Sequence, residues 1–308
     1  MTEFGTGIGL GHITRIKVIE TYLKKNNVTT KIILYERRET YGTDQSSWVN
    51  NLSWLDSVKK FNTVIVDSYL ASDDFFQKIR DKFQKIVVID DYNRISYPVD
   101  LLINPNVFFD KIDYSNQIAK CVGGMDFVLL REIFWNKRFE LLSVRPKSIL
   151  VSLGGSDYRD LYPLIASLAD HYKEMTFICP ERRSFDILKS MSPLVSVKGL
   201  LNESEIFDAY LSSEVVISGC GQSLHELFQL KKKTIGILID KDQKYNQEYY
   251  LSNGFLVYKN IWSDEDLILN IRNQIEELFF CSAPNYLSEF DPLLNLKKYF
   301  DLLVESDK

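Results

Sequence analysis

The chain has 308 residues and a formal net charge of −5, and 45% of its residues are hydrophobic and 26% charged. This length can bury a substantial core and favours two domains, and the composition is that of an ordinary globular protein. The acidic balance gives no electrostatic argument for binding nucleic acid, so we expect a small-molecule partner.

The composition also bears on location and redox state. The first residues are polar and glycine-rich, and no uninterrupted apolar segment of about 18 residues exists to span a bilayer. The four cysteines lack the close pairing of zinc motifs and the density of a disulfide scaffold. Two lysine runs, Lys59-Lys60 and Lys231-Lys232-Lys233, are expected to be solvated faces or helix ends. We expect a cytoplasmic monomer without stable membrane insertion.

A glycine-flanked histidine opens the first predicted helix, in the run from Gly9 through Gly11 and His12 to Arg15. Glycines let backbone N–H groups approach a ligand, a helix N-terminus favours negative charge, and imidazole titrates near neutrality. This geometry suits the activation of water beside a phosphate, with His12 as the base. A strand should precede such a loop in a doubly wound sheet, but so few residues come before Gly9 that we expect this strand to be short or missing. Either the sequence starts too far downstream or the sheet has lost its central strand.

Short apolar runs then alternate with a helical segment, which predicts a parallel sheet. Polar or turn residues follow three of the runs, at Asp67, at Asp90-Asp91 and at Asn104-Pro105-Asn106, so a functional edge is expected at the carboxyl ends of the strands. Asp90-Asp91 favours substrate hydrogen bonding or strand-end capping over a metal site. The predicted strands cover residues 32–34, 64–66, 86–89 and 101–103, and the predicted helix covers residues 72–83.

The pattern restarts near Arg145-Pro146, which predicts domains at residues 1–144 and 145–308. The charged, helical stretch from Ser263 onwards is counted with the second domain but could pack back across the hinge. We expect an α/β fold of two Rossmann-like domains with a cleft between them. In the second domain, strands are predicted at 149–153, 176–179, 215–218 and 234–239, and helices at 158–171, 204–211, 222–230 and 243–252.

Two glycine loops of the second half precede helices, Gly154-Gly155 and the run from Gly219 through Gly221 to Ser223. They could cradle a diphosphate or simply make tight strand-to-helix connections. Neither is a P-loop or a dinucleotide fingerprint, which disfavours ATP and NAD. Glu226 either accepts hydrogen bonds from ribose hydroxyls or forms a capping box with Ser223. His171 and His225 are expected to be structural or surface residues.

Taken together, these segments resemble the UDP-sugar hydrolase of pseudaminic acid biosynthesis and its spore-coat polysaccharide relatives, over most of the chain. The segments that carry the resemblance are Ile8 to Arg15, Val66-Asp67-Ser68-Tyr69, Ile89-Asp90-Asp91, Leu102 to Asn106, Leu129 to Phe134, Leu153 to Asp157, Ser218 to Glu226, and Asp242-Gln243.

The resemblance implies a glycosyltransferase-B-like fold and a metal-independent reaction without a cofactor. That reaction removes UDP from UDP-2,4-diacetamido-2,4,6-trideoxy-β-L-altropyranose, with His12 activating water for attack at the anomeric carbon. The implied substrate-binding residues are Gly9, Gly11, Arg15, Tyr69, Asp91, Gly154, Gly155, Gly221, Ser223, Glu226 and Gln243.

The chain departs from the family pattern in two places. Met1 and Glu3 stand where the family has an Arg-x-Asp strand end, and Asp242 stands where Asn is common. The rival hypotheses are a glycosyltransferase of the same fold, which would need an acceptor, and a nucleotide-sugar binding protein without turnover.

Overall fold

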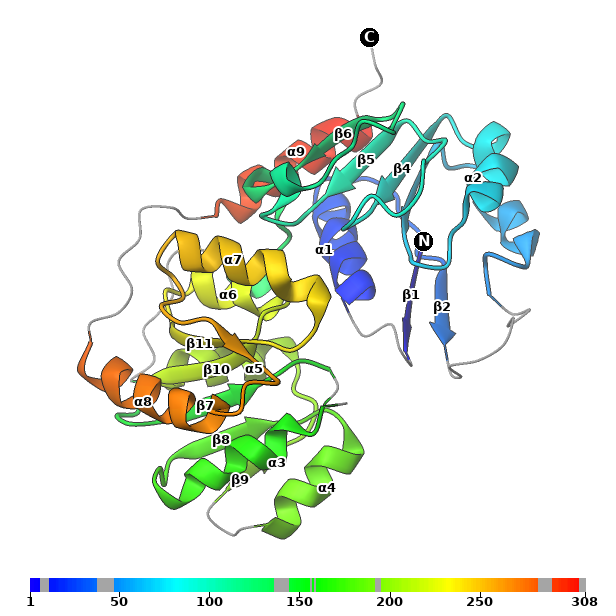
Figure 1. The fold of residues 1–308 in the computed structure, drawn as a ribbon. Coiled ribbons are helices and arrows are strands. Elements are labelled where there is room, and N and C mark those ends of the chain that lie inside the picture. Colours follow the sequence, from blue (N-terminus) through cyan, green and yellow to red (C-terminus); the bar gives the residue numbers. More distant parts are fainter. Residues whose placement is uncertain are drawn as a thin grey trace. The chain divides into compact units, whose positions relative to one another are not determined.

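The computed structural model describes residues 1–5, 11–37, 47–135, 144–155, 157, 159–191, 195–281 and 290–304. The chain folds into two compact units (Figure 1). The first combines Met1–Trp135 with Phe290–Lys308, and the second is Asn136–Glu289. Within the described ranges, no helix has both the length and the apolarity needed to span a bilayer.

A six-stranded parallel sheet forms the centre of the first unit, in the order β2-β1-β3-β4-β5-β6. The strand expected to be short or missing is present: β1 pairs with β2 along four residues but with β3 only at the Thr2–Asp67 pair. The strands are β1 (Thr2–Gly5), β2 (Leu34–Arg37), β3 (Thr63–Asp67), β4 (Lys85–Ile89), β5 (Leu101–Asn104) and β6 (Lys120–Gly123).

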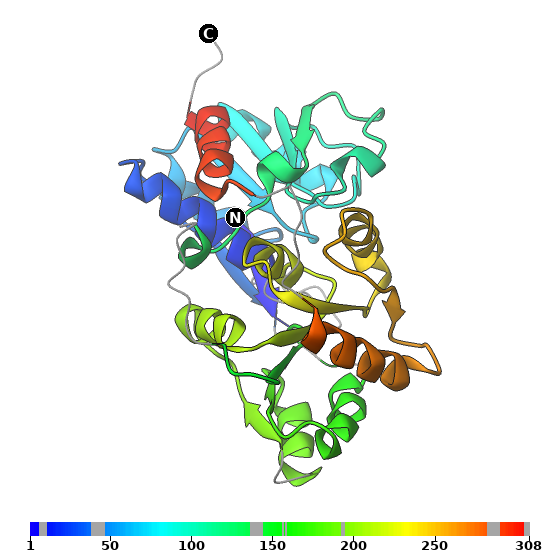
Figure 2. The same cartoon turned by 90° about the vertical axis from the view of Figure 1, so that its left-hand side faces the viewer.

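Helices cover both faces of this sheet, as the apolar runs of its strands require. One face packs against α1 and α9, which contact each other (Figure 2). The other face packs against α2 and the 3₁₀ segment η1. The helical segments are α1 (Gly11–Lys25), η1 (Leu52–Val58), α2 (Asp73–Ile79), η2 (Arg80–Lys82), η3 (Phe109–Lys111), η4 (Met125–Phe127), η5 (Glu132–Phe134) and α9 (Pro292–Val304).

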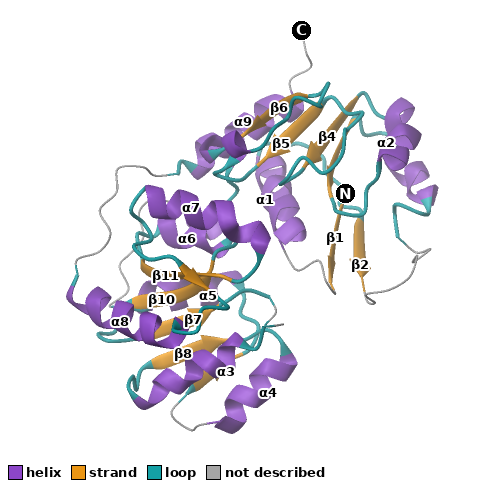
Figure 3. Ribbon diagram, in the orientation of Figure 1, coloured by secondary structure: helices purple, strands orange, loops and turns teal. Residues whose placement is uncertain are grey.

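The second unit repeats this plan with a parallel sheet in the order β12-β11-β10-β7-β8-β9 (Figure 3). Its strands are β7 (Ile149–Ser152), β8 (Met175–Ile178), β9 (Ser196–Lys198), β10 (Val215–Gly219), β11 (Lys233–Leu238) and β12 (Asn260–Ile261). Its helical segments are α3 (Leu161–Ala166), η6 (Ser167–Asp170), α4 (Arg182–Met191), α5 (Glu203–Ser212), α6 (Ser223–Gln229), η7 (Lys241–Gln243), α7 (Lys244–Ser252) and α8 (Leu267–Phe280).

The division of the chain differs from the expected one at the C-terminal end. Helix α9 belongs to the first unit, because Leu296 and Tyr299 are buried in the core beside α1 and β5. Two side chains tie the helix down further: Asn295 donates to the Val128 carbonyl at 3.1 Å, and the Tyr299 hydroxyl donates to the Phe127 carbonyl at 2.9 Å. The sequence marks this segment as helical but does not show which sheet it packs on.

Lys232 contradicts the expectation that the second lysine run is solvated. It is only 8% exposed, and its ammonium donates to the Ser213 and Leu211 carbonyls at 2.5 and 3.3 Å. Burial, aided by the neighbouring Lys233 charge, lowers the pKa of Lys232 to about 8. Lys232 directly precedes β11 and is buried, whereas Lys231 is exposed and Lys233 is partly exposed.

This buried ammonium makes stability depend on pH. An unfolded lysine has a pKa near 10.4, so between about pH 8 and 10.4 the unfolded chain binds more protons than the folded chain, and this group makes the free energy of unfolding rise with pH. Urea unfolding at pH 7.5 and 10 should show that Lys232→Met loses this rise. Lys173 is exposed, so Lys173→Met should keep the wild-type dependence of the free energy of unfolding on pH. If this free energy changes equally with pH in the two variants, the pH dependence does not come from Lys232.

The docking of α9 is testable with a matched pair of leucines. Leu296 is 1% exposed and Leu293 is 45% exposed on the same helix. We expect Leu296→Ala to lower the free energy of unfolding by about 2–5 kcal/mol, since it leaves a cavity, and Leu293→Ala to change it by about 0.5 kcal/mol or less. Urea unfolding measures both, and equal losses would show that α9 does not pack as described.

Candidate functional site

Four ionisable side chains meet at the carboxyl edge of the first sheet. His12 and Arg15 come from the first turns of α1, Asp67 ends β3, and Asp91 follows β4. All four are at most 8% exposed. Residues three apart on a helix share a face, so the histidine and the arginine reach the same carboxylate, Asp67. Gly11 opens the helix with an open space where a Cβ would stand, whereas the predicted ligand Gly9 lies outside the described residues.

The His12 ring is held by two neighbours. Its Nδ1 is hydrogen-bonded to Asp67 Oδ1, and the Tyr69 ring packs against it edge-to-face with centroids 4.4 Å apart. A carboxylate on Nδ1 keeps the proton on that nitrogen, which leaves the lone pair on Nε2. An imidazole oriented in this way is equipped to accept a proton from water.

Arg15 links the two carboxylates of the cluster. Its Nε and Nη2 lie 2.9 Å from the two oxygens of Asp67, and its Nη1 lies 2.5 Å from Asp91 Oδ1. The Nη2 atom also lies 3.1 Å from His12 Nδ1. The guanidinium is thus bound by the protein's own anions, an arrangement that its planar fork of donors suits. Substrate binding by Arg15 stays a prediction.

Asp91 receives further hydrogen bonds from neighbouring polar side chains. Asn106 Nδ2 donates to its Oδ1 at 2.6 Å and the Tyr69 hydroxyl to its Oδ2 at 3.2 Å. Burial by itself raises the pKa of a carboxyl, but the Arg15 guanidinium and the Asn106 donor hold the pKa of Asp91 below its ordinary value. Asp91 is therefore an anion beside Tyr69, which is partly exposed.

The preceding residue, Asp90, caps the strand end. Its Oδ1 accepts from the backbone N–H groups of Tyr92 and Asn93 at 2.8 and 2.5 Å, and its Oδ2 accepts from the Tyr97 hydroxyl. Across the described ranges, no group of three or more His, Cys, Asp or Glu side chains is placed to hold a metal ion.

Glu3 supports the loop that carries Tyr69. It is fully buried, and its carboxylate accepts from the Ser68 hydroxyl, from the Tyr69 N–H at 2.7 Å and from the Leu70 N–H at 3.2 Å. Burial raises the pKa of Glu3 despite these donors. Glu3, one of the two positions at which the sequence departs from the Arg-x-Asp pattern, thus fixes the loop between β3 and α2. Arg94 donates to the Tyr69 carbonyl of the same loop at 3.1 Å.

Three loops meet at the carboxyl edge of the second sheet. A Cβ on Gly219 would lie 2.8 Å from the Leu153 carbonyl, so the loop after β10 needs glycine to pass the loop after β7. Gly154 has φ +118°, a conformation that favours glycine. The third loop follows β11 and contains Gln243 of η7. Gln243 links it to the loop after β10, because its Oε1 accepts from the Cys220 and Ile239 N–H groups at 3.2 Å each.

The second unit's predicted ligands lie on these loops and on α6: Gly154 and Gly155 follow β7, Gly221 follows β10, Ser223 and Glu226 lie on α6, and Gln243 lies in η7. The capping-box alternative for Ser223 is wrong: α6 begins at Ser223 itself, and its N-cap, Gln222, makes no side-chain cap hydrogen bond. Glu226 is buried on that helix. His225 is also buried and lies 2.5 Å from the Tyr250 hydroxyl, which confirms it as structural.

Some residues of these two edges are missing from the sequence-based set. Asp67 stands in a quoted segment and follows a buried strand, which is the signal that could have identified it. Asn106 had the same kind of signal after β5. Arg159 had none: it donates to the Ile239 carbonyl at 2.9 Å and lies 3.8 Å over the Trp262 ring, a contact set entirely by the fold.

No family model matches the chain. A curated protein of Helicobacter pylori is 23% identical over 252 residues. It is named pseudaminic acid cytidylyltransferase and UDP-2,4-diacetamido-2,4,6-trideoxy-beta-L-altropyranose hydrolase. The match covers 80% of this chain but 45% of that protein, so the chain spans less than half the length of its relative.

Solved structures with similar folds cover nearly the whole chain. The S. aureus MnaA–UDP co-structure has a TM-score of 0.64 at 11% identity, covering 100% of this chain and 98% of that one. The Neisseria meningitidis UDP-GlcNAc 2-epimerase bound to UDP-GlcNAc has a TM-score of 0.62 at 15% identity. Acinetobacter baumannii MurG has a TM-score of 0.55 at 13% identity. Each of these two likenesses covers 98% of this chain and 98% of the other. These likenesses confirm the predicted glycosyltransferase-B-like fold.

The buried ion pairs of Arg15 can be tested by removing one charge. We expect Asp91→Asn to lower the free energy of unfolding at pH 7 by about 3 kcal/mol, because it leaves a buried guanidinium undercompensated. Asp74→Asn breaks an exposed pair with Lys78 and should cost less than about 1 kcal/mol.

The same variant has a defined pH dependence. The pKa of Asp91 is lower in the folded chain, so its stabilisation is complete above the unfolded value near 3.9 and is lost as the pH falls through the folded value. In urea unfolding, the gap between wild type and Asp91→Asn should therefore narrow below about pH 4. A gap that stays constant into acid would contradict an ionised Asp91.

Proposed function

We propose that this chain is a nucleotide-sugar hydrolase that releases UDP from UDP-2,4-diacetamido-2,4,6-trideoxy-β-L-altropyranose with water as the acceptor. The curated relative carries this activity in its name, and the similarity covers most of the present chain. Structures with this fold include one solved with UDP and one solved with UDP-GlcNAc. The observation that carries the proposal is the hydrogen-bonded His12–Asp67 pair at the start of α1.

In the proposed reaction, His12 Nε2 takes a proton from a water molecule as the water oxygen bonds to the anomeric carbon. The bond from that carbon to the diphosphate oxygen breaks, and UDP leaves with the bonding electrons. Asp67 orients the ring and stabilises the imidazolium that forms. The N-terminus of α1 favours the negative charge that the leaving group gains. No metal or cofactor has a part in this scheme.

The remaining predicted ligands divide between the two units. Tyr69 and Asp91 are proposed to contact the sugar, together with Gly9, Gly11 and Arg15 at the start of α1. In the second unit, the three loops held by Gln243 are proposed to bind the diphosphate through the N–H groups near Gly154, Gly155, Gly221 and Ser223. Glu226, buried on α6, is proposed to accept hydrogen bonds from the ribose hydroxyls.

The proposal predicts that the purified protein releases UDP from the diacetamido sugar nucleotide without an added acceptor. We expect His12→Ala to reduce the release by about 10²–10⁴-fold, the usual contribution of a general base. His171→Ala, which changes an exposed histidine, should retain full activity. Circular dichroism of both variants checks their folding.

Two outcomes would overturn the hydrolase. UDP release that requires an added sugar acceptor would identify a transferase. Stabilisation by UDP-sugars without any release would identify a binding protein.

A further inference from the structure

The loop between β3 and α2 carries Tyr69, which contacts two of the four ionisable side chains of the candidate site. Its ring packs edge-to-face on the His12 ring with centroids 4.4 Å apart, and its hydroxyl donates to Asp91 Oδ2 at 3.2 Å. Tyr69 is 41% exposed, so burial alone does not fix it. A side chain has several staggered rotamers, and its contacts therefore depend on how the backbone that carries it is held.

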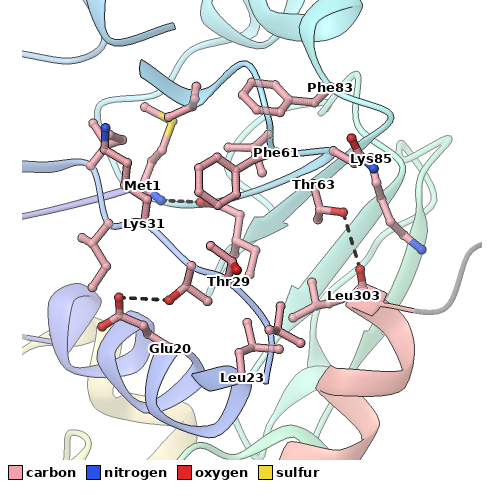
Figure 4. Close-up of a pocket in the computed structure, with 18 of the residues that line it drawn as sticks. Met1, Glu20, Leu23, Thr29, Lys31, Phe61, Thr63, Phe83, Lys85 and Leu303 are labelled. Carbon is pink, nitrogen blue, oxygen red and sulfur yellow. Dashed lines mark hydrogen bonds between the residues drawn. The ribbon is translucent and has the colours of Figure 1, made fainter. Parts of the chain in front are cut away.

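The strand that leads into this loop is fixed along its length. β3 pairs with β4 at all five of its residues, and at its first residue the Thr63 hydroxyl donates to the Leu303 carbonyl of α9 at 3.5 Å (Figure 4). In the loop itself, the Glu3 carboxylate accepts from the N–H groups of Tyr69 and Leu70. These contacts satisfy N–H groups of the loop, and its carbonyl groups need partners of their own.

Arg94 binds the carbonyl groups of this loop. Its Nη2 donates to the Ser68 carbonyl at 3.0 Å and to the Ala71 carbonyl at 3.2 Å, and its Nη1 donates to the Tyr69 carbonyl at 3.1 Å. The guanidinium carbon also lies 5.7 Å from the centre of the Tyr69 ring, within the range of a cation–π contact. One side chain thus contacts both the backbone and the ring of Tyr69.

The guanidinium is in turn held by the turn after β4. Arg94 Nε lies 3.6 Å from Asp90 Oδ2. The Asp90 carboxylate is buried and accepts from the Tyr97 hydroxyl and from two backbone N–H groups of its own turn. A guanidinium is a planar fork that can serve several acceptors in one fixed orientation, whereas a lysine ammonium is a point charge on a flexible stem. The turn after β4 therefore fixes the loop after β3 through one arginine.

We propose that Arg94 is a positioning residue of the site, which sets the Tyr69 ring against His12 and directs the Tyr69 hydroxyl at Asp91. This role rests on the proposed function, in which His12 activates water and Tyr69 contacts the sugar. A displacement of about 1 Å in an active site can cost about 10²-fold in rate. Losing the three carbonyl contacts should therefore slow the reaction without weakening the binding of UDP, whose proposed ligands lie in the second unit.

The first test measures the contact between the two rings in the protein without substrate. The chain has three histidines, and the ring resonances of His12 are those that disappear from the proton–carbon NMR spectrum in His12→Ala. Because the two rings are in contact, the ring current of Tyr69 shifts these resonances, and Tyr69→Leu gives their position without that shift. We expect Arg94→Met to move them toward the Tyr69→Leu position. Arg80→Met, which removes an arginine hydrogen-bonded to Asp100, should leave them unmoved.

The second test measures UDP release from the diacetamido sugar nucleotide. We expect Arg94→Met to lower kcat by about 10–100-fold and to keep the wild-type Kd for UDP, and we expect Arg80→Met to change neither. Should Arg94→Met fail to fold, Arg94→Lys replaces it in both tests with the same expected direction of change, because its ammonium cannot span the three carbonyls.

The outcomes separate positioning from a contribution to stability alone. A variant of Arg94 that melts at a lower temperature but keeps the wild-type His12 resonances would overturn the proposal. Equal movement of these resonances in Arg80→Met, or an unchanged kcat in Arg94→Met, would also overturn it. A wild-type protein that releases no UDP would end the hydrolase proposal, and the NMR spectra would still decide whether Arg94 positions Tyr69.

Discussion

The buried ion network around Arg15 is the constraint on which the first unit depends. A guanidinium and two carboxylates removed from water are tolerated only when each charge is paired and hydrogen-bonded. Here Asp67 and Asp91 each face the guanidinium, and Asn106 completes the partners of Asp91. The network therefore fixes α1 against the ends of β3 and β4, and His12 takes its orientation from the same carboxylate that anchors the arginine.

The carboxyl edge of the first sheet is stabilised by hydrogen bonds between polar side chains of its strands and groups of other elements. Asp67 and Asp91 accept from Arg15 of α1. Glu3 of β1 accepts from the Tyr69 N–H in the loop after β3.

At the carboxyl edge of the second sheet, the loops approach one another closely through their backbones. Glycine at position 219 lets two loops come together, and one glutamine amide links them to the third. Helix α9, which follows the second unit in the chain, packs in the core of the first unit.

The sequence by itself determined the two alternating β/α units and their polar carboxyl edges, because apolar runs and the residues that end them are local signals. It also marked His12, Asp91 and the glycine loops. Only the tertiary structure decided that Arg15 bridges two carboxylates, that Lys232 is buried and that α9 packs on the first sheet. Those features depend on contacts between residues far apart in the chain, and no periodicity or spacing encodes which distant partner a side chain meets.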